Sequence, residues 1–101
     1  MSTAVALTPE EADEVRAILR RHLPPGVRVH VFGSRAAGRV KPWSDLDLVL
    51  EGDGPVPWSA MAELAEAFDE SRLPWKVDLV DRATVSPQFA RIVDDQKVRF
   101  L

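Results

Sequence analysis

The stretch "DLDLVLE" at residues 45–51 constrains the fold of this chain more than any other segment. Side chains two apart in a β-strand project from the same face of the sheet, so Asp45 and Asp47 would share one face and the three leucines of the segment the other. The Cα atoms of the two aspartates would then lie about 6.5 to 7 Å apart. The pattern predicts a half-buried strand whose polar face carries a pair of carboxylates.

Elements on either side of this strand alternate between helix and strand. Apolar residues at helical spacing predict helices at 9–23, 58–71 and 87–95, alternating or apolar runs predict strands at 27–32 and 75–81, and an extended tail follows at 97–101. A short turn or helix begins at Gly33. This order is typical of an α/β architecture, and 101 residues suffice for a single domain spanning 1–101.

Composition narrows the classes of partner and metal site. Without cysteine, thiolate metal sites are excluded, so a metal would need oxygen ligands or His22 and His30, which show no metal-binding spacing. A net charge of −3 gives no bulk attraction for nucleic acid. Neither a secretory signal nor an apolar run of the roughly 20 residues that cross a bilayer is found, so the sequence predicts a cytoplasmic protein.

A third carboxylate can join the first two. In "WKVDLVD", residues 75–81, Asp78 alternates with the apolar Val77 and Leu79, and it would complete an acidic triad if its strand pairs with the strand of Asp45 and Asp47. Carboxylates that share a site repel one another unless a cation lies between them. Mg²⁺ prefers oxygen ligands and is commonly completed by phosphate oxygens, so the triad predicts a magnesium site.

Residues that suit phosphate binding lie between the first two strands. Gly33 directly follows a strand and lets an anion approach the backbone, and Ser34 adds a hydroxyl donor. The cations Arg35, Arg39 and Lys41 follow, and Arg35 is the best placed of them to neutralise a triphosphate.

Gly33-Ser34, a ten-residue spacer and Asp45-x-Asp47 together resemble the signature of the DNA polymerase β-like nucleotidyltransferase superfamily. The fuller string "FGSRAAGRVKPWSDLDLVL", with "VDLVD" downstream, is similar to the minimal nucleotidyltransferase (MNT) proteins over residues 9–100. The resemblance implies the nucleotidyltransferase fold, a small mixed β-sheet flanked by helices.

The resemblance also implies an activity, the transfer of AMP from ATP to an acceptor hydroxyl with the help of two Mg²⁺ ions. The implied metal-binding and catalytic residues are Asp45, Asp47 and Asp78, and the implied nucleotide-binding residues are Gly33, Ser34, Arg35 and Ser44. Asp78 would share a metal ion and help to deprotonate the acceptor.

Many MNT proteins are antitoxins paired with a HEPN-type ribonuclease toxin, and some add AMP to a tyrosine of that toxin. This chain has no tyrosine, which fits an acceptor on another protein. The alternative is an antitoxin that blocks its toxin by forming a complex, without catalysis. Adenylylation of an antibiotic is disfavoured because there is no room for a second substrate domain, so specificity would come from a protein partner, an oligomer or an open cleft.

Two positions depart from the family pattern, and the three tryptophans are assigned from their places in the sequence. Relatives often have glycine after the last helix and tyrosine near the C-terminus, where this chain has Gln96 and Phe100. A left-handed Gln96 would cost about 1 kcal/mol. Trp43 could stack on a base or anchor a partner, whereas Trp58 and Trp75 are expected in the core.

Overall fold

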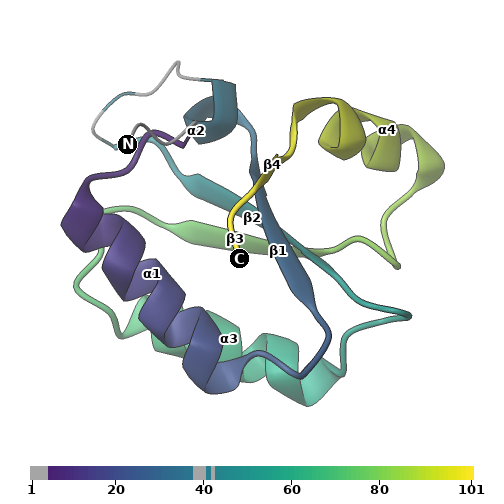
Figure 1. Ribbon diagram of the computed structural model, residues 1–101, viewed down its shortest axis with the longest axis horizontal. Coiled ribbons are helices and arrows are strands. Elements are labelled where there is room, and N and C mark those ends of the chain that lie inside the picture. The colour runs from purple at the N-terminus through teal and green to yellow at the C-terminus, as the bar shows by residue number, and fades with distance from the viewer. Residues whose placement is uncertain (1–4, 38–40, 42) are drawn as a thin grey trace.

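The structure is a computed structural model that describes residues 5–37, 41 and 43–101 (Figure 1). Its helices are α1 (Pro9–His22), α2 (Ser34–Ala37), α3 (Trp58–Asp69) and α4 (Pro87–Gln96). The sequence explains where α1 and α4 begin, because each follows a hydroxyl residue that accepts a backbone hydrogen bond from the first turn and each has proline at its first position.

The strands form one four-stranded mixed sheet. They are β1 (Arg28–Phe32), β2 (Leu46–Glu51), β3 (Val77–Asp81) and β4 (Val98–Arg99), in the order β3-β2-β1-β4. β1 pairs antiparallel with β2 and with β4, whereas β2 and β3 are parallel and are connected through α3. This arrangement confirms the mixed α/β fold that the sequence predicts.

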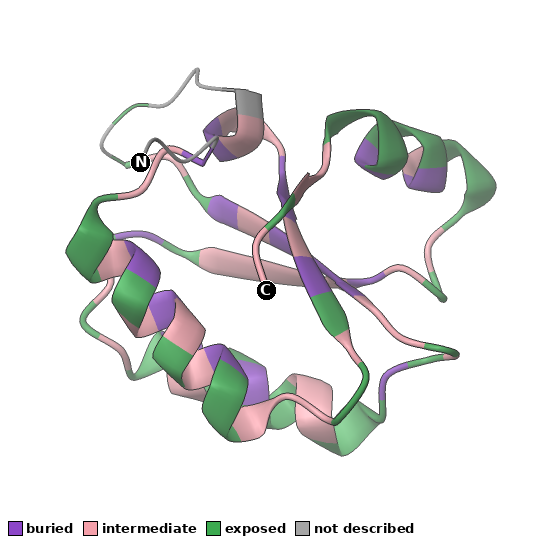
Figure 2. Cartoon of the chain, in the orientation of Figure 1, coloured by how far each residue is buried: buried purple, intermediate pink, exposed green. Residues whose placement is uncertain are grey.

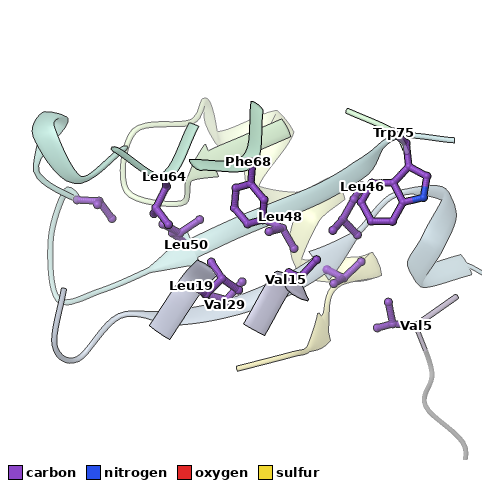
Figure 3. Close-up of a cluster of buried hydrophobic side chains, with 12 residues drawn as sticks. Val5, Val15, Leu19, Val29, Leu46, Leu48, Leu50, Leu64, Phe68 and Trp75 are labelled. Atoms are coloured by element: carbon purple, nitrogen blue, oxygen red, sulfur yellow. The ribbon is translucent and has the colours of Figure 1, made fainter. Parts of the chain in front are cut away.

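Helices α1 and α3 cover one face of the sheet, and the main core lies between them and the strands (Figures 1 and 3). The leucines of "DLDLVLE" are fully buried here, as their alternation predicts, and they pack with the apolar faces of both helices. Figure 2 shows α1 buried on its inner side and exposed on its outer side. The largest fully buried side chains are Val15, Leu19, Val29, Val31, Leu46, Leu48, Val49, Leu50, Leu64 and Val93.

The opposite face of the sheet carries a smaller apolar cluster beneath α4. Phe32 of β1 and Val49 of β2 pack with Val93, and the Phe89 ring meets the Phe32 ring edge-on at 5.8 Å between centroids. This cluster covers only part of the face, and Asp47 of β2 and Asp78 of β3 project from the same side, because they alternate with the core residues of their strands.

Three details differ from the sequence predictions. Trp58 was expected in the core, but it opens α3 on the outside and is 83% exposed, while Trp75 is buried as predicted. Gln96 was expected after the last helix, but it is the last residue of α4, and the following Lys97 has the extended angles φ −67° and ψ 142°, so the cost of a left-handed cap does not arise. Asp45 precedes β2 instead of opening it.

No helix in the described part of the chain has the length and apolar character needed to span a bilayer.

The last aspartate of β3 has a structural role. Asp81 is buried, and its carboxylate accepts hydrogen bonds from the backbone N–H groups of Val56, at 2.8 Å, and Ala83, at 3.0 Å. It therefore ties the segment before α3 to the end of β3.

We expect Asp81→Ala to lower the free energy of unfolding by about 2 to 4 kcal/mol, because two backbone donors lose their charged acceptor in a buried place. Urea denaturation measures the change. The exposed Asp53→Ala is the matched control and should change stability by less than about 0.5 kcal/mol. Equal effects of the two substitutions would contradict the structural role of Asp81.

Candidate active site

Two of the three predicted aspartates lie side by side. The parallel register of β2 and β3 pairs Asp47 with Asp78, and both project from the face of the sheet that α4 partly covers. The Asp78 side chain is 45% exposed, and Lys76 Nζ lies 4.0 Å from its carboxylate. The structure thus brings together two carboxylates that are 31 residues apart in sequence.

The surroundings of Asp47 disfavour its charge. Burial, the charges of Asp78 and Asp45, and a hydrogen bond with Asp78 raise the pKa of Asp47 from its ordinary value of 3.8 to about 6. A proton or a cation would relieve the unfavourable negative charge of Asp47. The pair is therefore suited to binding a metal ion or accepting a proton.

Gly33 lies against the same carboxylate. Its φ of +77° belongs to the left-handed region, and a Cβ built on it would overlap Asp47 Oδ2. Its backbone N–H donates to Gln96 Oε1 at 3.1 Å. The residue must therefore be glycine for two reasons, its backbone conformation and the closeness of Asp47.

Asp45 is placed less tightly than the other two aspartates. It is exposed and lies in the residue before β2, although its charge is felt at Asp47. In the ranges 5–37, 41 and 43–101, no three histidine, aspartate or glutamate side chains converge closely enough to form a metal site. Asp47 and Asp78 therefore make up the paired part of the site, and a third ligand from Asp45 stays a prediction.

Arg35 is bound within the protein. It is only 4% exposed, it donates to the carbonyl oxygens of Ala6 and Ser44, and its guanidinium stacks 4.4 Å above the Trp75 ring. Burial lowers its pKa below the ordinary value of arginine. These contacts join the N-terminal segment to the loop before β2, a role that the sequence analysis did not foresee. A contact with phosphate stays a prediction.

The remaining predicted residues are placed as follows. Ser34 is the first residue of α2 and is partly exposed. Ser44 Oγ accepts from the backbone N–H of Lys41, whose Nζ lies 5.6 Å from the centroid of the Trp43 ring. Trp43 itself is 70% exposed. Arg39 lies outside the described residues.

A groove of about 490 Å³ between α3 and β3 reaches Asp78, which lines it together with Trp58, Met61 and Lys76. A larger depression of about 600 Å³ lies beside Arg35 and Trp75 and is not lined by the aspartates. Of these two depressions, the smaller groove is the one that has a predicted site aspartate, Asp78, in its lining.

Comparison with known proteins places this geometry in context. Residues 12–100 match the family described as "Nucleotidyltransferase domain". A Haemophilus influenzae protein described as "Probable protein adenylyltransferase MntA" is 46% identical over 84 residues, which make up 83% of this chain and 73% of that protein.

Two solved structures have similar folds. One is a crystal structure of a toxin-antitoxin with AMP-PNP, with a TM-score of 0.73 and 26% identity over 89% of this chain and 72% of the other. A second is a tri-AMPylated Shewanella oneidensis HEPN toxin in complex with an MNT antitoxin, with a TM-score of 0.65 and 24% identity over 89% of this chain and 68% of the other. At its lower identity, the second likeness concerns the fold alone.

The raised pKa of Asp47 predicts a pH-dependent stability. An acid whose pKa is higher in the folded state stabilises that state below the unfolded pKa of 3.8, and this contribution is lost as the pH rises through about 6. Relative to wild type, Asp47→Asn should therefore have a higher free energy of unfolding at pH 7.5, and this advantage should be smaller at pH 4.5. The gain should be about 1 to 2 kcal/mol, less than the full shift implies because water still reaches the carboxylate.

Urea denaturation of wild type and Asp47→Asn at the two pH values, in metal-free buffer, measures this difference. Asp53→Asn serves as the exposed control. A stability difference that does not depend on pH would show that Asp47 is not held in the unfavourable surroundings described above.

The contact between Gly33 and Asp47 can be tested against a second glycine. Gly26 has a similar φ of +82° but nothing within 4 Å of a built Cβ. Gly26→Ala should cost about 1 to 2 kcal/mol for the backbone strain alone, and Gly33→Ala about 1 to 3 kcal/mol more because of the overlap. Adding Asp47→Ala should recover the extra loss in Gly33→Ala but not the loss in Gly26→Ala.

Proposed function

The chain belongs to the nucleotidyltransferase domain family, and we propose that it is a protein adenylyltransferase that transfers AMP from ATP to a hydroxyl group of a HEPN-type toxin, acting as the antitoxin of that toxin. The observation that carries the proposal is the pairing of Asp47 with Asp78 beside Gly33, in a chain that is 46% identical to a protein described as an adenylyltransferase.

The carboxylate pair is chemically suited to Mg²⁺. Asp47 and Asp78 offer hard oxygen ligands side by side, and the raised pKa of Asp47 indicates an unbalanced negative charge that a cation would neutralise. We assign the metal ligands to Asp45, Asp47 and Asp78. When bound, Mg²⁺ would stabilise the negative charge of the triphosphate and of the pyrophosphate leaving group.

Other groups of the protein would bind the triphosphate and the acceptor. Gly33 and Ser34, at the turn after β1, would hold the triphosphate close to Asp47. The acceptor hydroxyl would approach through the groove that Asp78 lines, and Asp78 would take up its proton. The acceptor oxygen forms a bond to the α-phosphorus while the bond from that phosphorus to the oxygen bridging to the β-phosphorus breaks, and pyrophosphate leaves.

A protein acceptor fits the composition of the chain. Its 101 residues include no tyrosine that could be modified in the chain itself. A structure of similar fold is a toxin-antitoxin with AMP-PNP, and another contains an AMPylated HEPN toxin. A protein with this function would act in the cytoplasm, where ATP and the RNA substrates of such a toxin are present.

Replacing the first two aspartates separates catalysis from simple binding. Asp45→Asn with Asp47→Asn removes the charge for Mg²⁺ while nearly conserving side-chain volume, so we expect loss of AMP transfer and of toxin neutralisation in a protein that still folds. The measurements are growth rescue in cells that express the cognate toxin and the mass of the toxin, which each transferred AMP increases by one nucleotide unit.

The exposed pair Asp13→Asn with Asp53→Asn makes the same change of charge on the surface, away from the groove that Asp78 lines, and should behave as wild type. If the well-expressed site variant rescues growth without any change in toxin mass, the protein acts as a binding antitoxin and the enzymatic proposal is wrong.

A further inference from the structure

Gln96 connects the C-terminal helix to the turn after β1. It is the last residue of α4, and its Oε1 accepts the hydrogen bond from the backbone N–H of Gly33 across 63 residues of sequence. None of the predicted site residues lies on α4. The contact therefore brings an additional element to the glycine that touches Asp47.

The chain on both sides of Gln96 is fixed to the sheet. On the N-terminal side, Val93 packs against Phe32, the residue that precedes Gly33. On the C-terminal side, Lys97 Nζ contacts Glu51 of β2 at 2.9 Å and Asp94 at 3.2 Å. Val98 then pairs with β1. The Gln96 side chain thus starts from a backbone that has little freedom to move relative to β1.

The hydrogen bond acts on a peptide whose orientation matters. Gly33 has an unusual φ, and its Cα lies so close to Asp47 that a Cβ would overlap Oδ2. Glycine has the broadest conformational freedom of all residues, so a turn that starts on glycine needs an external contact to hold one conformation. Gln96 Oε1 supplies that contact at the Gly33 N–H.

We propose that Gln96 is a positioning residue for the triphosphate, which acts by holding the Gly33 peptide so that the Gly33-Ser34 turn is ordered beside Asp47 before the nucleotide arrives. The proposal rests on the proposed function, because it assigns the same turn to the nucleotide. An ordered turn spares the nucleotide the cost of ordering it on binding, so Gln96 should affect nucleotide affinity more than the chemical step.

The test compares Gln96→Met with Gln88→Met. Methionine has a similar length but no comparable acceptor, and Gln88 is an exposed glutamine on the same helix. Gln96→Met should weaken the binding of ATP in the presence of Mg²⁺ about five-fold, the scale of one hydrogen bond. It should also raise KM for ATP by a similar factor, with kcat within two-fold of wild type. Gln88→Met should match wild type in all three quantities.

Hydrogen exchange at the Gly33 amide adds a readout that is independent of activity. It should accelerate in Gln96→Met and not in Gln88→Met, because the amide loses its acceptor. An ATP affinity of Gln96→Met equal to or tighter than that of wild type would overturn the positioning role, as would a loss confined to kcat. Failure of the wild type to bind ATP at all would instead count against the proposed function.

Discussion

The parallel pairing of β2 with β3 is the constraint on which the site depends. Burial of the three leucines of β2 against α1 and α3 fixes which face of that strand is apolar, and so forces Asp47 onto the other face. The register then sets Asp78 directly opposite Asp47. A slip of one residue would bury an aspartate in the core, so the hydrophobic effect on one face of the sheet holds two mutually repelling carboxylates together on the other.

This arrangement places the repulsion between Asp47 and Asp78 at the proposed catalytic site. Two neighbouring carboxylates, one of them half-buried with its pKa raised to about 6, make no contribution to stability that explains their proximity. By contrast, Asp81 in the same strand is satisfied by two backbone donors and stabilises the fold. The two aspartates of β3 therefore differ: the fold explains the place of Asp81, whereas the place of Asp78 beside Asp47 points to a function.

Two long-range polar contacts hold the segments around the carboxylates. Arg35 fastens the N-terminal segment and the loop before β2 through carbonyl oxygens and the face of Trp75. Gln96 fastens the turn after β1 to α4. A buried arginine and an exposed glutamine therefore each join backbone segments that lie far apart in the sequence.

The order of helices and strands and the half-buried character of β2 could be predicted from the sequence, because alternation and helical spacing are local properties of the chain. The contact of Asp78 with Asp47 was predicted only on the condition that their strands pair, and that pairing is a long-range contact that the structure supplies. The sequence also indicated Gly33, as a place where an anion can approach the backbone, but its left-handed φ and its closeness to Asp47 are seen only in the structure. It could not decide that Trp58 lies outside while Trp75 is buried, since both are large apolar residues near the start of an element. Nor could it reveal the contacts of Arg35 with Ala6 or of Gln96 with Gly33. These join residues 29 and 63 positions apart, and such distances are set only when the packing of the sheet and helices brings the segments together.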